Sequence, residues 1–263
     1  MKVLQNIALI PKIVRLYRNP FIYYLDKMKA FGVGKMLTVA LRNGLRFKIH
    51  SGNSDINSLN EIFLSDSYEK IFSELRPDST FIDMGANIGI VSVAAAARLT
   101  TGKVFAFEPN PEVLALLREN IALNKLEDRV AVYPLGVAGT TGVRTMYFEP
   151  MMWGGGRIIP DKRHDMRTQQ FDVRCVGLGD ALSLTGVPSI DFVKIDCEGA
   201  EGEILSGASR ETFEKIGRVL VEYHEPHVSA AGIKAVLERN GFTVEPSGDF
   251  KAYYAERKAQ VNK

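Results

Sequence analysis

The sequence predicts an α/β protein built around a mostly parallel sheet. From Thr80 onward, short apolar runs of strand length alternate with longer helical patterns, and this order is typical of parallel strands joined by crossover helices. The first of these runs, Thr80–Met84, ends in a loop that contains two glycines, and the alanine-rich helical pattern of residues 90–97 follows it. A glycine loop between a strand and a helix lets the backbone approach a ligand closely.

The glycine loop differs from the fingerprint of dinucleotide-binding proteins, G-x-G-x-x-G. Counted from Asp83 it reads D-x-G-x-N-x-G, and Asn87 is one of the few residue types other than glycine that tolerate a positive φ. A second acid, Glu108, follows the apolar run Val104–Phe107. An acid at the tip of the second strand can accept hydrogen bonds from both hydroxyls of a ribose. The loop and Glu108 together indicate a cofactor that contains a nucleoside.

Further stretches of the chain carry a family resemblance. Residues 194–201, KIDCEGAE, resemble the K-I-D-x-E-G-x-E signature of FkbM-type methyltransferases, and residues 81–89 resemble the F-x-D-x-G-A-N-x-G loop of that family. Residues 108–111, 120–124 and 221–224 are also similar, and the motifs follow the family order from about Tyr68 to Glu225. The resemblance implies S-adenosylmethionine as cofactor. It also implies a Rossmann-like class I methyltransferase fold, with a mostly parallel seven-stranded sheet and helices on both faces.

Length and composition limit the other possibilities. A chain of 263 residues accommodates one α/β domain with additions or two small domains; we expect an N-terminal helical and hairpin extension, residues 1–60, and a methyltransferase domain, residues 61–263. The 33 basic and 31 acidic residues leave a net charge of +2, which argues against a broad nucleic-acid-binding surface. Cys175 and Cys197 are too few for a disulfide scaffold or a zinc cluster and fit a reduced, cytoplasmic setting. No apolar run has membrane-spanning length, and no signal-peptide pattern is evident.

The first 31 residues differ from the rest of the chain. Apolar side chains alternate there with lysines and arginines, and Asp26 is the only acid. This segment either lies on a membrane as a basic amphipathic helix or packs on the domain with its basic face exposed. Pro11 and Pro20 interrupt the helical pattern and favour packing. Membrane contact would place the protein at the inner face of the membrane as a peripheral protein.

The remaining elements are predicted from local patterns. Thr38–His50 reads as a hairpin around Asn43-Gly44, a type I′ turn signal, and Asp55–Leu75 reads as helical. Asn110 can cap a helix that Pro111 opens. We expect further strands at residues 130–134, 143–148, 171–176, 191–195 and 217–222, a closing hairpin at 242–245 and 251–255, and helices at 178–184, 201–208 and 229–240.

Residues near the predicted carboxyl edge of the sheet form a candidate cofactor site. Tyr68 and Glu69 resemble a Tyr-Glu pair that borders the family's cofactor pocket, although an ordinary surface pair is the alternative. Asp83 can reach a charged ligand group or hold the glycine loop, and Glu108 can bind a ribose or act as a helix N-terminal charge. An adenine can sit beside Gly136. The full candidate set is Tyr68, Glu69, Asp83, Gly85, Ala86, Asn87, Gly89, Glu108, Pro109, Asn110, Gly136, Val137 and Asp196.

Residues 151–166 break the alternation of strands and helices. They include the only tryptophan and lack periodicity. Long irregular loops in compact domains often serve as lids over a site, so we expect either a substrate lid or a disordered insertion here. The candidate lid residues are Trp153, Arg157, Lys162, Arg163 and His164.

The candidate catalytic residues follow the fourth and fifth core strands. Ligands of open α/β sheets bind outside the carboxyl ends of the strands, where Asp196 and His224 are expected. A histidine has an unperturbed pKa of about 6.5 and suits the role of a base. Period-two alternation puts Glu222 and His224 on one face. We therefore predict His224 as base, Glu222 as its orienting residue and Asp196 as a positioning residue, with Asp196 as the competing base.

No metal is expected, because Asp196 and Glu198 have no further oxygen ligands nearby in the sequence. His224 and His227 have the spacing of a possible metal pair, but Pro226 between them makes a regular helix unfavourable. The sequence thus leaves acid–base chemistry as the expected role of these groups.

The function expected from these features is methyl transfer from S-adenosylmethionine to a hydroxyl. The acceptor would be a sugar, a glycolipid or polysaccharide, or a secondary metabolite, and the preference for oxygen comes from the family resemblance. An NAD(P)-dependent reductase is the enzymatic alternative, but neither G-x-G-x-x-G nor a Tyr-x-x-x-Lys pair marks the chain. A non-catalytic, membrane-associated binding protein is the other alternative, supported by the basic N-terminal segment.

Overall fold

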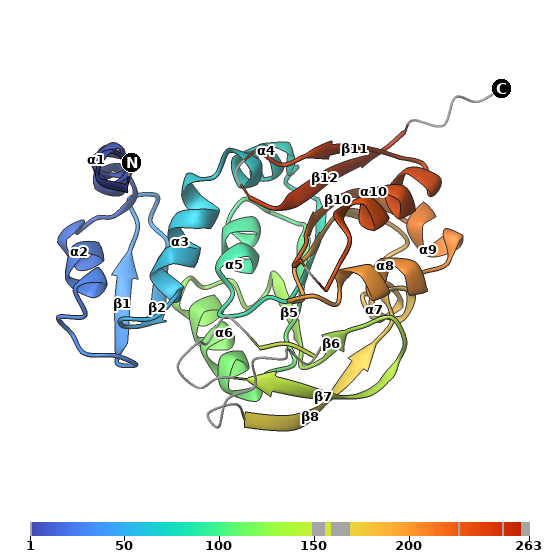
Figure 1. The fold of residues 1–263 in the computed structure, drawn as a ribbon, viewed down its shortest axis with the longest axis horizontal. Helices are drawn as coiled ribbons and strands as arrows, with labels where there is room; N and C mark the ends of the chain where they lie inside the picture. The colour runs from blue at the N-terminus through green and yellow to red at the C-terminus, as the bar shows by residue number, and fades with distance from the viewer. Residues whose placement is uncertain (1, 149–155, 159–168, 226, 249, 259–263) are drawn as a thin grey trace.

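The computed structural model describes residues 2–148, 156–158, 169–225, 227–248 and 250–258, with side chains from residue 9 onward. Figure 1 shows a central sheet with helices on both faces and an N-terminal extension that lies beside helix α3. No helix in these described ranges has the length and apolar character needed to cross a membrane.

The central sheet has seven strands in the order β11-β12-β10-β9-β3-β4-β5. Strand β12 is antiparallel to β10 and β11, and the other neighbouring strands are parallel. The predicted fold class and closing hairpin are therefore confirmed. The strands are β3 (Thr80–Met84), β4 (Lys103–Phe107), β5 (Val130–Tyr133), β9 (Ile190–Ile195), β10 (Ile216–Glu222), β11 (Phe242–Pro246) and β12 (Ala252–Arg257).

Alternating side chains of the strands enter two apolar cores. Phe81 of β3 faces the core shared with α3, α4, α5 and α6, whereas Ile82 and Met84 face the core shared with α7, α8, α9 and α10. This follows from the period of two along a strand. The helices are α3 (Asp55–Leu64), α4 (Asp66–Glu74), α5 (Ile90–Ala96), α6 (Pro111–Leu123), α7 (Leu178–Leu184), α8 (Glu201–Gly207), α9 (Arg210–Glu214) and α10 (Ala230–Arg239).

The prediction that residues 55–75 are helical is confirmed, and the region consists of two helices, α3 and α4. Ser65 has extended backbone angles, with ψ 132°, and separates α3 from α4. Its side-chain oxygen accepts hydrogen bonds from the backbone N–H groups of Ser67 and Tyr68, so Ser65 caps α4. The predicted cap of α6 is confirmed, because the side chain of Asn110 accepts from the N–H of Glu112.

The predicted N-terminal hairpin is confirmed, but its turn type is not. Strands β1 (Met36–Ala40) and β2 (Arg46–His50) pair in antiparallel register. A type I′ turn needs positive φ at both central residues, and here Gly44 has φ +95° whereas Asn43 does not have positive φ. Asn43 instead accepts a hydrogen bond from the N–H of Leu45 through its side chain. That bond stabilises a longer loop, in which the N–H of Gly44 donates to the carbonyl of Leu41.

The N-terminal extension packs on α3. Helix α1 (Lys2–Leu16) continues through Pro11, so the prediction that Pro11 interrupts it was wrong, whereas Pro20 sits at the N-cap of α2 (Phe21–Lys27). The hydroxyl of Tyr17 donates to the side chain of Asn60 in α3 at 2.7 Å. The expected boundary at residue 60 falls inside α3, and the division into ranges 1–60 and 61–263 stays a prediction.

A small second sheet has the order β6-β8-β7 and consists of β6 (Gly136–Val137), β7 (Gly142–Phe148) and β8 (Gln169–Val176). The strands predicted at 143–148 and 171–176 are thus confirmed. Within the predicted lid only residues 156–158 are described, and the backbone of Arg157 pairs with that of Tyr147. The other candidate lid residues, Trp153, Lys162, Arg163 and His164, lie outside the described residues.

Candidate active site

The glycine loop lies at the carboxyl end of β3, between β4 and β9. Gly85 has φ +75°, and a Cβ atom at this position would collide with the backbone oxygen of Asp196, so a side chain is excluded here. Asn87 has φ +50°, which confirms the prediction that this residue takes a left-handed conformation. The loop therefore brings backbone close to β9, where a ligand-binding edge is expected.

Glu108 fixes the other side of the loop. One carboxylate oxygen accepts from the backbone N–H of Asn87 at 2.9 Å, and the other accepts from the N–H of Asn110 at 2.8 Å. Burial raises the pKa of Glu108 to about 7, while these two hydrogen bonds oppose the rise. Each oxygen keeps a lone pair for a ligand hydroxyl. The contact with a ribose stays a prediction.

A buried ion-pair network supports the loop from within. Asp83 is fully buried, accepts a hydrogen bond from the hydroxyl of Ser92 at 2.6 Å and lies 3.2 Å from the ammonium of Lys194. Lys194 donates to the carbonyl of Gly85 at 2.8 Å and lies 3.3 Å from Asp196. Asp83 therefore holds the loop through Lys194. Lys194 belongs to the family motif, but the sequence analysis assigns it no role; the signal that could have revealed one is a lysine within a buried strand.

Two cavities meet at the loop. The first, of about 630 Å³ including its mouth, has polar groups together with apolar walls. The second, of about 430 Å³, lies against α3 and α4. Gly85, Asn87 and Asp196 line both. The first is also lined by Phe107, Glu108, Pro109, Asn110, Val113, Gly136, Val137, Met146, Gly156, Ile158, Cys197 and Glu198, and the second by Ser58, Glu61, Ile62, Tyr68, Ala86, Ile88, Ile90, Val91, Lys194 and Glu222.

Three candidate cofactor residues lie outside the cavity walls. Tyr68 lines the second cavity and is buried, but the side chain of its neighbour Glu69 is exposed and lines neither cavity. Successive residues of a helix project about 100° apart, so an inward Tyr68 turns Glu69 outward. The placement predicted for Glu69 is therefore corrected. Asp83 and Gly89 lie behind the cavity walls. Asp83 is the buried ion-pair partner of Lys194, and Gly89 is the N-cap of α5.

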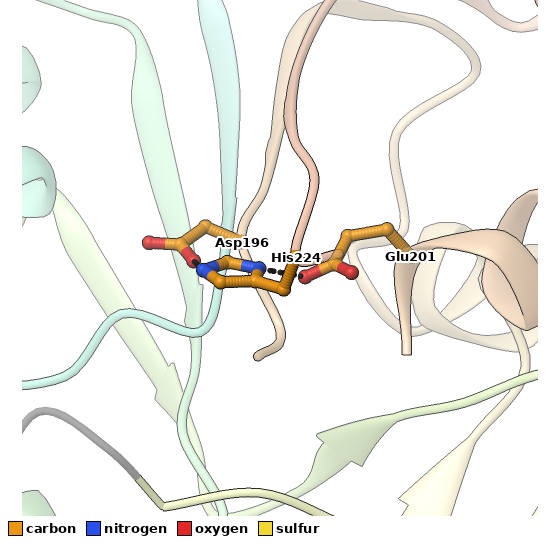
Figure 2. A group of neighbouring side chains, drawn as sticks. All are labelled: Asp196, Glu201 and His224. Carbon is orange, nitrogen blue, oxygen red and sulfur yellow. Dashed lines mark hydrogen bonds and ion pairs between the residues drawn. The ribbon is translucent and has the colours of Figure 1, made fainter. Parts of the chain in front are cut away.

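His224 is oriented by a residue that sequence reasoning did not select for this role. Its Nδ1 lies 3.0 Å from a carboxylate oxygen of Glu201 (Figure 2), and Glu201 is completely buried. The carboxylate of Glu201 also accepts from the backbone N–H groups of Cys197 and Gly199. The expectation that Glu222 orients His224 is thus corrected. Glu201 begins α8 and His224 follows β10, so only the tertiary fold joins them.

The other ring nitrogen of His224 faces three carboxylates. Its Nε2 lies 3.9 Å from Asp196, 3.8 Å from Glu198 and 3.9 Å from Glu222. These separations exceed hydrogen-bond length. The Nε2 therefore points into a space that carboxylates surround, next to the residue that both cavities share. The structure brings the predicted trio of His224, Asp196 and Glu222 together.

The crowding of acids changes the protonation of the site. Burial lowers the pKa of His224, but the hydrogen bond that its Nδ1 makes to Glu201 and the charges of Asp196 and Glu198 outweigh burial and raise this pKa to about 9. Burial and the charge of Asp196 raise the pKa of Glu222 to about 8 and that of Glu198 to about 7. Near neutral pH Glu222 and His224 thus retain protons and Glu198 is partly protonated, because the neighbouring carboxylates favour the protonated forms.

Comparison with known proteins decides the family. Residues 83–244, more than half of the chain, match the methyltransferase FkbM domain. The chain belongs to the FkbM methyltransferase family. The protein is therefore an S-adenosylmethionine-dependent methyltransferase, as the sequence motifs predicted.

The chain is similar to individual proteins of known name. The FkbM-family chain is 28% identical over 215 residues to the 31-O-demethyl-FK506 methyltransferase FkbM of Streptomyces tacrolimicus, covering 72% of this chain and 82% of that protein. It is 31% identical over 158 residues to the hexuronic acid methyltransferase AglP of Haloferax volcanii, covering 59% of each. The crystal structure of precorrin-6y C5,15-methyltransferase from Geobacter metallireducens is similar with a TM-score of 0.44 and 17% identity, covering 73% of this chain and 88% of that one.

The residues of the first cavity fit the cofactor of this FkbM-family methyltransferase. The side-chain oxygen of Asn87 and the side-chain nitrogen of Asn110 are buried without a hydrogen-bond partner, and both residues line the cavity. Unpartnered buried polar atoms are costly unless a ligand satisfies them. Together with Glu108 and the apolar side chains of Phe107 and Val137, they suit a ligand that has a polar ribose and a flat apolar base.

The same site has groups that can bind metals. Ligand atoms of Asp196, Glu201 and His224 lie within 4.8 Å of one another. This cluster was not visible in the sequence, because its members come from three elements. Glu201 already accepts from two backbone N–H groups and from the imidazole, and the absence of a required metal stays a prediction.

We predict that Glu108→Ala weakens binding of S-adenosylhomocysteine by about 10- to 100-fold. The variant removes an acceptor that can bind ribose hydroxyls, and a charge-assisted hydrogen bond contributes roughly 1.5–3 kcal/mol. Titration calorimetry measures the affinity. Glu112→Ala, which removes an exposed carboxylate from the first turn of α6, serves as the control. Equal affinities of the wild type and Glu108→Ala would contradict the ribose assignment.

Turnover should survive removal of divalent cations, because Glu201 is already occupied by protein donors. The measurement is methyl transfer before and after treatment with EDTA and gel filtration. Loss of turnover that Mg²⁺ or Mn²⁺ restores would contradict this expectation and make Asp196 and His224 metal ligands.

Proposed function

We propose that this FkbM-family methyltransferase methylates a hydroxyl oxygen of a sugar, of a glycolipid or polysaccharide, or of a secondary metabolite. The observation that carries the proposal is the imidazole of His224, whose Nδ1 is held by Glu201 and whose Nε2 faces Asp196. A hydroxyl keeps its proton at neutral pH, so methylation needs a base beside it. The relatives that act on an O-demethyl compound and on a hexuronic acid support this acceptor class.

The proposed division of roles follows from the geometry. The cofactor supplies an activated methyl group when bound. Asp196 lines both cavities and positions the groups that meet between them. The neutral imidazole of His224, with its Nδ1–H donated to Glu201, accepts the proton of the acceptor hydroxyl at Nε2, and the buried carboxylate of Glu201 then stabilises the imidazolium. Asp196 as base remains the competing assignment.

Protonation of His224 limits this mechanism. A pKa of about 9 keeps the imidazole charged near neutral pH, and a charged imidazole cannot accept a proton. A cation bound beside Asp196 disfavours the imidazolium and lowers the pKa of His224. We therefore propose that the base becomes available only in the complex with the cationic cofactor.

We infer a cytoplasmic protein that binds a small-molecule or glycan acceptor and no nucleic acid, with peripheral membrane contact through residues 1–31. The support for membrane contact is that Asp26 is the only acid in this segment and is buried. The reductase alternative is disfavoured by the family assignment.

The acceptor can be sought directly. Wild-type protein is incubated with S-adenosylmethionine and extracts that contain sugars, glycolipids or secondary metabolites. The proposal expects formation of S-adenosylhomocysteine together with an acceptor that gains the mass of one methyl group. Methylation of nitrogen, carbon or sulfur in the product would overturn the oxygen assignment.

His224→Ala should lower turnover by roughly 10²- to 10⁴-fold, the usual contribution of a general base, and leave the affinity for S-adenosylhomocysteine nearly unchanged. Steady-state turnover and calorimetry measure the two effects. His227→Ala, a change at an exposed histidine three residues on, is the matched control. Near-wild-type turnover of His224→Ala across roughly pH 6 to 9 would remove His224 from the mechanism and promote Asp196.

Binding of S-adenosylmethionine near pH 8 should release more protons than binding of S-adenosylhomocysteine. The two ligands differ by the sulfonium charge, which favours ionisation of Glu222 and deprotonation of His224, so the difference should reach up to about one proton. Calorimetry in buffers of different ionisation enthalpy measures it. Combining Glu222→Gln with His224→Ala should abolish the difference, and equal release in the wild type would refute a sulfonium position beside these groups.

A further inference from the structure

The charge of the chain is unevenly distributed. Residues 1–54 contain ten lysines and arginines and a single acid, Asp26, a net charge of +9 within a chain whose total is +2. Asp26 is 1% exposed, and its carboxylate accepts a hydrogen bond from the N–H of Gly52 at 2.7 Å. The surface of this extension therefore presents basic side chains without any acidic side chain between them.

Exposed apolar side chains are concentrated in the same extension. Among the described residues, seven of the nine large apolar side chains that are exposed lie between residues 10 and 36. Phe21 is 71% exposed and Met28 is 76% exposed. Scattered exposed apolar residues are ordinary, but a concentration of them in one small segment marks an interaction surface. The seven are Ile10, Val14, Phe21, Leu25, Met28, Val33 and Met36.

Helix α2 presents its apolar stripe to solvent. Phe21, Leu25 and Met28 occupy positions i, i+4 and i+7, one face of a helix, and all three are exposed. The opposite side carries Tyr23 and Asp26, which are buried. In Figure 1, α2 lies at the outer edge of the molecule, beyond β1 and away from the central sheet. The part of the chain that the structure describes leaves this stripe uncovered.

The described part of helix α1 packs on one side. Its Ile13 and Leu16, and Tyr17 just after it, are buried in the core that includes residues of α3, whereas Ile10 and Val14 are exposed. Residues 1–31 were expected either to lie on a membrane or to pack on the domain, and the described part of α1 packs. The unpartnered surface lies further along the chain, over residues 21–36, and lysines at positions 27, 29 and 35 flank it.

We propose that residues 21–36 form a docking surface for an anionic lipid bilayer. The stripe of Phe21, Leu25 and Met28 enters the boundary between headgroups and acyl chains, while the lysines attract anionic headgroups; membrane-surface helices combine these two features. Charge alone would also suit nucleic acid, but binding to phosphates uses no exposed aliphatic stripe. An anionic bilayer offers acyl chains to the apolar groups and charged headgroups to the basic groups, so it is the partner that matches both.

The docking surface is connected to the candidate active site through α3. The ammonium of Lys27 donates to the side chain of Asn57, and the following turns of α3 supply Ser58, Glu61 and Ile62 to the wall of the second cavity. A bilayer bound at α2 would thus be near the helix that lines this cavity. The further idea that the bilayer delivers a membrane-bound acceptor to this cavity rests on the proposed function. The binding of lipid does not.

Flotation of the full-length protein with vesicles tests the proposal. Vesicles of phosphatidylcholine alone are compared with vesicles that also contain phosphatidylglycerol, at low and at physiological salt. We expect binding to the anionic vesicles and weaker binding as salt rises, because salt screens exposed charges. The paired change Phe21→Ser and Met28→Ser, and separately Lys29→Gln and Lys35→Gln, should each lower the bound fraction at least about tenfold.

The matched control is Val143→Ser with Leu184→Ser, which removes the exposed large apolar side chains outside the extension among the described residues. It should bind vesicles as the wild type does. Thermal unfolding and affinity for S-adenosylhomocysteine show that each variant is folded, independently of the reaction. Absence of binding to anionic vesicles, an equal loss in the control, or binding to RNA without binding to lipid would each overturn the proposal.

Discussion

The architecture of the site depends on the buried ammonium of Lys194. Burial lowers the pKa of a lysine, but Asp196 and Asp83 outweigh burial and raise this pKa well above its usual value. Charges without such partners are costly to bury. By bonding the carbonyl of Gly85 and lying between the two carboxylates, Lys194 links the carboxyl ends of β3 and β9. The glycine loop and Asp196 thus have defined positions before any ligand binds.

The acids around His224 give this edge of the sheet a second property. The ammonium of Lys194 is surrounded by more carboxylates than it can neutralise, so Glu222 and His224 retain protons near neutral pH and Glu198 is partly protonated. A negatively charged interior of this kind favours a cationic ligand. This is the physical basis of the proposed coupling between cofactor binding and deprotonation of His224, because both depend on the same charges.

In the N-terminal extension one helix packs on the domain and the next exposes apolar side chains. Helix α1 joins the core of the domain, while α2, which follows it, directs its polar Asp26 inward and its apolar stripe outward. Tyr23 of α2 also lies in the core, and Ile22 and Tyr24 pack against that core, so the exposed stripe is a second apolar face of the same helix. This second face supports a partner outside the described chain, and its basic surroundings indicate which kind.

The fold class, the glycine loop, the cap of α6 and the hairpins could be predicted from the sequence, because they depend on periodicity and on short-range signals. The family was predicted from the resemblance of several motifs to known ones, and the order of the strands put Asp196 and His224 at the same edge. The packed fold was needed to show that Glu201 rather than Glu222 orients His224, that Lys194 holds the loop, and that Glu69 faces solvent. A helical period reveals that α2 has an apolar face, but only the packing around Tyr23 and Asp26 decides which way that face points.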